Sequence, residues 1–187
     1  LLQHNSALQV HYRTGSEALA YLLKGECDMA GFQIPTAPYQ NASLAHYGQY
    51  FQSEELLLLY LAKRRVGLFV QKGNPLAIHG MADLLKPEVR VVNRQQGSGS
   101  RHLMQLMLEE QRLDADRVLN YGATEFTHMA VAAHVASGMA DTGFGIETAA
   151  WRCGLDFISL ADERYFFAFH RSKGNSELIQ SFLSLVR

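Results

Sequence analysis

The sequence predicts an α/β fold with mainly parallel strands, and three observations support this prediction. Segments with strand character alternate with amphipathic helices along the 187 residues, as they do in repeated β-α-β units. The opening strand, helix and strand imply a parallel pair joined by a right-handed crossover. A turn rich in Gly, Ser or Thr recurs between a strand end and a helix start, at residues 15–16, 97–100 and 125–127.

The first half of the chain contains short elements with clear boundaries. Residues 7–12 alternate apolar and polar side chains, which is typical of a strand. The first helix is expected at 17–24, with Ser16 as its N-cap and Gly25 as its C-terminal stop. The remaining elements predicted here are strands at 28–32, 67–70 and 89–93, an apolar segment at 51–62 and a short helix at 81–85.

The second half continues the alternation. The turn at 97–100 opens a helix from Arg101 to about Gln111, and Thr127 opens the next helix, which ends at Gly138. The elements predicted after it are a strand at 140–144, a helix at 145–152, strands at 157–160 and 165–170, and a closing helix at 176–186.

Composition excludes several classes of protein. With 48% apolar and 19% charged residues, the chain is not a disordered tail. Its 17 basic and 18 acidic residues give no basic excess of the kind that a nucleic-acid-binding surface shows. The longest apolar run, 56–62, is far shorter than the roughly 20 residues that a membrane-spanning helix needs. No secretory signal is visible, so a cytoplasmic location is expected, with a periplasmic one as the alternative.

Metal binding and catalysis find little support. No His-x-x-x-His or Cys-x-x-Cys spacing occurs, so neither a metal site nor a cofactor is expected. No nucleophile is paired with a base, which argues against an enzyme. Asp141 either lines a cleft or caps the helix predicted at 145–152. Cys27 and Cys153 are expected to be reduced structural thiols, although the sequence leaves a disulfide open.

The segment 93–101 carries the clearest binding signal. Its glycines allow close approach of a ligand to the backbone, its serines offer hydroxyl donors, and its arginines add fixed charge. The start of the helix that follows favours an anion. The alternative interpretation is a capped helix behind a flexible turn with exposed arginines. Neither the Walker nor the dinucleotide spacing is present. The residues concerned are Arg94, Gly97, Ser98, Gly99, Ser100 and Arg101.

Two other turns repeat this arrangement on a smaller scale. Gly15-Ser16 and Thr127-His128 each precede or begin a helix, and each alone reads as an ordinary cap. Together with 97–100 they are predicted to meet on the carboxyl side of the sheet, where α/β folds bind ligands. Arg64-Arg65 and 163–165 are interpreted either as solvated charge pairs or as a two-strand hinge with Tyr165 facing the cleft.

Several motifs together resemble one known family. The stretches 93–101, 127–132, 138–146 and 154–158 occur in that order, with 28–31 and 73–75 upstream and 163–165 downstream. The sequence is similar over nearly its whole length to the periplasmic-binding-protein-like domain found fused to molybdate-type helix-turn-helix regulators and to molybdopterin-biosynthesis proteins.

This resemblance implies a type-2 periplasmic-binding fold, in which two α/β lobes joined by two crossover strands hold a ligand between them. Lobe 1 is expected at 1–66 and 166–187, and lobe 2 at 67–165. The family's usual first strand is expected before Leu1, so lobe 1 is expected to be truncated at its N-terminus as part of a longer protein. Gln33 stands where the family more often has His, which bears on ligand preference.

The expected function is that of a ligand-sensing domain of a transcription regulator, with an N-terminal helix-turn-helix domain and a homodimer as expected partners. Its ligand is expected to be a small oxyanion, such as molybdate or tungstate, or a related anionic metabolite. The alternatives are a solute-binding protein of an uptake transporter and a domain of a molybdopterin-biosynthesis enzyme. The predicted ligand-binding residues are Gly15, Ser16, Gln33, Arg94, Gly97, Ser98, Gly99, Ser100, Arg101, Thr127, His128, Asp141 and Tyr165.

Overall fold

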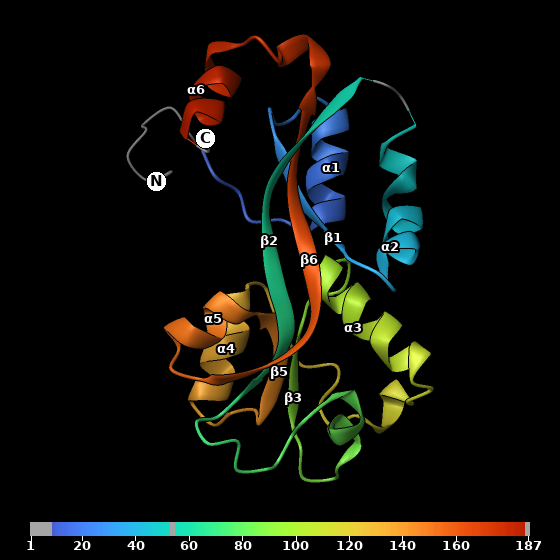
Figure 1. Ribbon diagram of the computed structural model, residues 1–187, viewed down its shortest axis with the longest axis vertical. Coiled ribbons are helices and arrows are strands. Elements are labelled where there is room, and N and C mark those ends of the chain that lie inside the picture. The colour runs from blue at the N-terminus through green and yellow to red at the C-terminus, as the bar shows by residue number, and fades with distance from the viewer. Residues whose placement is uncertain (1–8, 53–54, 186–187) are drawn as a thin grey trace.

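Two long antiparallel strands run through the whole molecule and join two groups of helices and strands (Figure 1). The structure is a computed structural model, and it describes residues 9–52 and 55–185. The long strands are β2 (Leu56–Val70) and β6 (Asp156–His170), and the sheet they belong to has the strand order β1-β6-β2-β5-β3-β4. The two predicted α/β lobes and their two crossover strands are therefore present.

Lobe 1 surrounds one half of the long strand pair. It contains β1 (Ala30–Pro35), which pairs antiparallel with β6, and the helices α1 (Gly15–Leu23), α2 (Gln40–Tyr47) and α6 (Glu177–Leu185). Its core forms where α1 and α2 pack against one face of β1. The fully buried members of this core include Leu19, Leu22, Phe32 and Tyr47.

Lobe 2 surrounds the other half, and its helices cover both faces of the sheet (Figure 1). One core gathers Leu103 and Met104 of α3 against Phe144, and a second gathers Val131 and Val135 of α4 against Phe69. Because α3 and α4 follow the parallel strands β3 and β4, both helices begin at the sheet edge that faces lobe 1. The elements are β3 (Val91–Arg94), α3 (Gly99–Glu110), β4 (Thr124–Glu125), α4 (His128–Ala136), β5 (Thr142–Ile146) and α5 (Glu147–Arg152).

The prediction of mainly parallel strands is wrong. The pairs β1-β6, β6-β2 and β2-β5 are antiparallel, and only β3-β5 and β3-β4 are parallel among the described strand pairs. The error arises from β2 and β6, because the sequence pattern predicted two short segments in place of each long strand. Charged residues in the middle of both strands, at 63–65 and 162–164, interrupt the apolar pattern where the strands pass between the lobes.

The start of the chain also differs from the prediction. Residues 7 and 8 of the expected strand lie outside the described residues, and 9–12 form no strand. The N-cap of α1 is Thr14, not Ser16. Thr14 Oγ1 accepts from the Glu17 amide at 3.2 Å, and Glu17 Oε2 accepts from the Thr14 amide at 2.9 Å. This capping box needs an acid three residues after the cap, which Thr14 has and Ser16 lacks. Gly25, with φ of 73°, confirms the predicted stop.

Replacing Thr14 by alanine is expected to lower the free energy of unfolding by about 1 kcal/mol, because the Glu17 amide loses its acceptor. Urea unfolding followed by circular dichroism measures the change. Thr124→Ala, at an exposed position outside the helices, is the control and is expected to change stability by less than about 0.5 kcal/mol. Equal losses in the two variants would contradict the capping role of Thr14.

Two smaller expectations concern cysteines and membranes. Cys27 and Cys153 are free thiols and form no disulfide, which confirms the expectation that they are reduced. Within residues 9–52 and 55–185, no helix combines the length and the apolar character needed to cross a membrane.

Candidate functional site

The two lobes meet where the first turns of α1 and α3 face the hydroxyl of Tyr47. A Cβ atom on Gly15 would lie 2.8 Å from Tyr47 Oη, and one on Gly99 would lie 3.1 Å from it. The Gly99 Cβ would also lie 2.3 Å from Nε2 of Gln33, which belongs to lobe 1. Tyr47 is 1% exposed, and its hydroxyl has no hydrogen-bond partner. The lobes therefore touch at a seam that has no room for a side chain at Gly99.

Three helices leave backbone amides free at their starts, α1 and α3 at this seam and α4 close to Arg64 and Arg94. The side chains of Thr14, Ser98 and Thr127 cap α1, α3 and α4, and each accepts only the third amide of its helix. The first two amides of a helix have no intrahelical acceptor, and in the described part of the chain no other acceptor contacts them. Such helix starts attract anions. The free amides belong to Gly15, Ser16, Gly99, Ser100, His128 and Met129.

A cluster of charged side chains lies at the centre of the long strand pair. Arg64 donates a hydrogen bond to Glu163, its register partner on β6, which is 1% exposed. The Arg64 guanidinium also lies over the ring of Tyr165, 4.4 Å from its centroid. Burial raises the pKa of Glu163, and Arg64 opposes this shift. The ion pair with Arg64 therefore stabilises a carboxylate that is otherwise costly to bury.

A second arginine joins this cluster from lobe 2. Arg94 ends β3, and burial, followed by the charge of Arg64, lowers its pKa. The Nε atoms of Arg64 and Arg94 are both buried without a partner. Arg64 thus has a carboxylate partner, whereas among the described residues no carboxylate contacts Arg94, whose positive charge remains uncompensated. We name Arg64, Arg94, Glu163, Tyr165 and His128 the arginine cluster.

His128, the first residue of α4, is held in its neutral form. Burial lowers its pKa well below the usual value, and the charges of Arg94 and Arg64 add to the shift. The side chain keeps part of its surface exposed. Its Nδ1, however, is buried without a partner against Gly145, whose Cβ would lie 2.8 Å away. A neutral imidazole can donate from one ring nitrogen and accept at the other.

The lowered pKa of His128 predicts a stability change with pH. The unfolded chain binds this proton near pH 6.5 while the folded chain does not, so folding stability is present above that pH and falls below it. Relative to His128→Gln, the wild type is expected to lose up to about 1.4 kcal/mol per pH unit below pH 6.5. Urea unfolding between pH 5 and 8 measures this difference. His79→Gln at an exposed position is the control, and parallel profiles for wild type and His128→Gln would contradict the account.

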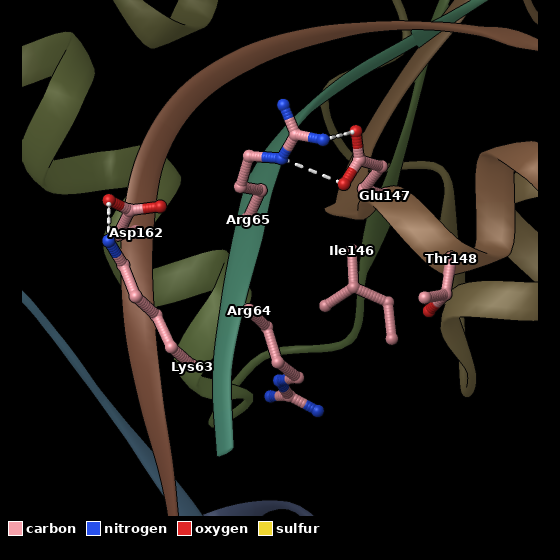
Figure 2. Close-up of a pocket in the computed structure, with 7 residues that line it drawn as sticks. All are labelled: Lys63, Arg64, Arg65, Ile146, Glu147, Thr148 and Asp162. Carbon is pink, nitrogen blue, oxygen red and sulfur yellow. Dashed lines mark hydrogen bonds and ion pairs between the residues drawn. The ribbon is translucent and has the colours of Figure 1, made fainter.

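A cavity of about 310 Å³ lies beside the strand pair near α5. Figure 2 shows that Arg65 contacts both carboxylate oxygens of Glu147, with Nε at 2.8 Å, and that Lys63 pairs with Asp162 at 2.7 Å. Arg64 extends away from the Arg65-Glu147 pair (Figure 2). The cations of Lys63 and Arg65 are thus neutralised, and they fasten the strands to each other and to α5. The lining residues are Lys63, Arg64, Arg65, Ile146, Glu147, Thr148 and Asp162.

The structure brings most of the predicted ligand-binding residues to the seam or to the arginine cluster. Gly97, with φ of 79°, lies opposite Thr14, and Ser100 is buried in the first turn of α3. Ser16 Oγ lies 3.1 Å from Nε2 of His46. The residues at the seam are Gly15, Ser16, Gln33, Gly97, Ser98, Gly99 and Ser100, and those in or beside the arginine cluster are Arg94, Thr127, His128 and Tyr165.

The side chains of two predicted residues are engaged by partners outside the predicted site. Asp141 neither lines the cleft nor caps α5, because its carboxylate binds Arg90 at 2.8 Å. Both residues precede parallel strands, so they lie at the amino ends of those strands, away from lobe 1. The Arg101 guanidinium stacks on Tyr121 at 4.2 Å and donates to the Arg94 carbonyl at 3.4 Å, and it lines a cavity of about 660 Å³ beside α3 that Gly97 also lines.

Sequence reasoning missed three members of the site. Arg64 and Glu163 were placed at a hinge but not assigned to a ligand, because a sequence does not show that two residues 99 positions apart face each other. Tyr47 carried no signal, since a tyrosine on a short helix is ordinary.

The described residues contain no group of three or more His, Cys, Asp or Glu side chains that would hold a metal ion.

The fold and the site together define a two-lobed α/β domain, with polar side chains and free amides where the lobes meet. The family model described as the PBP superfamily domain matches residues 2–187, and the chain belongs to this family.

One curated relative is the uncharacterized protein YvgK of Bacillus subtilis strain 168. It is 34% identical over 154 residues, which cover 82% of this chain and 50% of that protein. This chain therefore spans about half the length of that relative.

Solved structures share the fold at low sequence identity. The regulatory domain of a HypT variant from Salmonella typhimurium matches with a TM-score of 0.69 and 13% identity, over 96% of this chain and 82% of that one. The CcmR regulatory domain of Synechocystis PCC6803 in complex with 2-PG matches with a TM-score of 0.62 and 16% identity, over 92% and 78%. A sulfate-bound OxyR2 regulatory domain from Vibrio vulnificus matches with a TM-score of 0.57 and 16% identity, over 93% and 76%.

Proposed function

We propose that this domain senses a small anionic ligand, bound between its lobes, as the sensor part of a transcription regulator. The ligand is a small oxyanion, such as molybdate or tungstate, or a related anionic metabolite. The observation that carries the proposal is that Arg94 lies beside Arg64 with its Nε buried and unpartnered, while the buried carboxylate of Glu163 pairs with Arg64 alone among the described residues. A bound anion would neutralise the positive charge of Arg94, which has no acidic partner among the described residues.

The chemistry of the seam supports this choice. Hydrogen bonds from an arginine to an anion are charge-assisted and stronger than neutral ones. Excluding water between the lobes strengthens them further. A ligand that contacts both lobes binds the closed form better than the open form, and so shifts the protein towards closure. In this proposal the chain passes from one lobe to the other near residues 66–67 and again near residues 165–166. The domain binds its ligand and does not catalyse a reaction.

The role in regulation is supported by the structures that share the fold. Regulatory domains recur among the structures that share the fold, and one of them is described as sulfate-bound. We therefore favour a cytoplasmic regulator that also carries a helix-turn-helix domain and forms a homodimer. This part of the proposal is tested by identifying the domain to which the sensor is joined in the intact protein.

Calorimetry and thermal unfolding test the ligand. Molybdate, tungstate, sulfate and phosphate are each titrated into the protein, and at least one is expected to release or absorb heat and to raise the melting temperature at millimolar concentration. Arg117→Gln, which changes an exposed arginine of lobe 2, is expected to bind as the wild type does. No heat and no thermal shift with any of the four ions would reject an inorganic oxyanion and leave organic anions.

A further inference from the structure

We propose that the seam binds an organic acid with two anionic groups, one held by the arginine cluster and the other by the first turns of α1 and α3. This inference rests on the proposed function and narrows it, because a single tetrahedral ion supplies only one such group. The structure contains two sets of donors for these groups, and the buried carboxylate of Glu163 lies within reach of both.

The first set of donors surrounds the hydroxyl of Tyr47. This hydroxyl is buried, has no partner, and lies against Gly15 of α1 and Gly99 of α3. The first two amides of both helices have no acceptor among the described residues. A buried hydroxyl without a partner is costly, and an anionic oxygen between the two helices would accept from it and from the amides.

The second set of donors is the arginine pair. Arg64 and Arg94 each have a buried Nε without a partner, and Arg64 already uses part of its guanidinium on Glu163. A carboxylate or phosphate there would neutralise the remaining positive charge. Because a guanidinium presents a planar fork of donors, it suits either group.

Glu163 lies within reach of both sets. It lies on β6, whose neighbours are β1 on one side and β2 on the other. Its register partners are Arg64 on β2 and Pro35 on β1, and Tyr47 packs on Phe32 of the same β1, with 5.5 Å between ring centroids. After burial, the charge of Glu163 is the largest cause of the raised pKa of Tyr47, which places the carboxylate within electrostatic reach of that hydroxyl.

A ligand with two anionic groups fits this arrangement better than a compact ion does. A compact ion close enough to use both sets would also lie within reach of the Glu163 carboxylate, and like charges repel. An organic acid can place one anionic group in each set of donors and keep its neutral connecting part beside Glu163. The expected ligand class is therefore dicarboxylates and phosphorylated carboxylates of a few carbon atoms.

The test compares two groups of probes by calorimetry on the full chain. The probes with two anionic groups are malonate, succinate, phosphonoacetate and phosphoglycolate, and those with one are acetate, sulfate, phosphate and tungstate. The best probe with two anionic groups is expected to bind about 10- to 100-fold more tightly than the best probe with one, which is the increment of one further charge-assisted contact.

Two variants then test the two ends separately. Tyr47→Phe removes only the unpartnered hydroxyl and is expected to weaken the best probe with two groups by about 2- to 10-fold. Arg94→Gln is expected to weaken it by about 10- to 100-fold. The matched controls are Tyr121→Phe and Arg117→Gln, which lie outside the seam and are expected to leave affinity unchanged. Thermal unfolding confirms that each variant folds.

The outcomes separate this inference from the proposed function. A tighter probe with two anionic groups that loses affinity in both variants supports the inference. A single-group ion that binds as tightly as every probe with two groups overturns it and leaves the proposed function standing. A probe with two groups that is weakened by Arg94→Gln alone also overturns it. If no anion of either group binds, the proposed function fails and the inference fails with it.

Discussion

Replacing Arg94 by glutamine is expected to weaken binding of the anionic ligand by about 10- to 100-fold, because a charge-assisted hydrogen bond contributes about 1.5–3 kcal/mol. Arg94 is the guanidinium whose charge has no carboxylate partner in the arginine cluster. Glutamine keeps a hydrogen-bond donor but removes the charge. Calorimetry with the tightest anion of the wild type measures the loss.

Arg117→Gln provides the matched control for this result. It removes the same charge from the same lobe at an exposed position, so a general effect of net charge on anion binding would appear in both variants. Because Arg94 and Arg64 repel each other, the melting temperature of Arg94→Gln without ligand is expected to equal or exceed that of the wild type. Equal affinities of Arg94→Gln and Arg117→Gln would show that the cluster is not the binding site.

Replacing Gly99 by valine is expected to lower ligand affinity at least tenfold by keeping the lobes apart. A Cβ at this position would lie 2.3 Å from Gln33 Nε2 and 3.1 Å from Tyr47 Oη. Gln33 has a flexible side chain and can move, whereas Tyr47 is fully buried in the core of lobe 1. The methyl groups of valine would therefore collide with Tyr47 when the lobes close. The tenfold change corresponds to destabilising the closed, ligand-bound form by about 1.4 kcal/mol.

The stability of the unliganded protein distinguishes blocked closure from misfolding. The atoms that a Gly99 Cβ would meet belong to lobe 1, so lobe 2 is expected to fold around valine normally. Small-angle scattering is expected to show a larger radius of gyration for Gly99→Val than for the wild type when ligand is present. Gly122→Val, where no atom lies within 4 Å of the added Cβ, is the control. A variant that binds ligand with wild-type affinity would contradict the proposed closure at this seam.

Much of the fold was predictable because local signals mark the helix boundaries. The stop of α1 at Gly25 and the caps Ser98 and Thr127 lie where turn chemistry places them. Strand direction was not predictable in the same way. The charged residues 63–65 lie within one continuous strand, because Arg64 and Arg65 find acidic partners on other elements.

The candidate site was predicted in part, for a related reason. The glycines and serines at helix starts carry a local signature, and Gly15, Ser98 and Gly99 do lie at the seam. Arg101 and Asp141 have suitable chemistry, but their side chains contact Tyr121 and Arg90. Glu163 and Tyr47 enter the site only through tertiary packing, which no short motif encodes.

Anomalous diffraction from crystals grown with tungstate would test the central claim, that the seam between the lobes is an anion site, most directly. The account predicts a tungsten peak at the seam, in contact with the Arg94 guanidinium or with the free amides of α1 and α3. Tungsten found only on the outer surface, for example beside the exposed Arg117, with none at the seam, would contradict it.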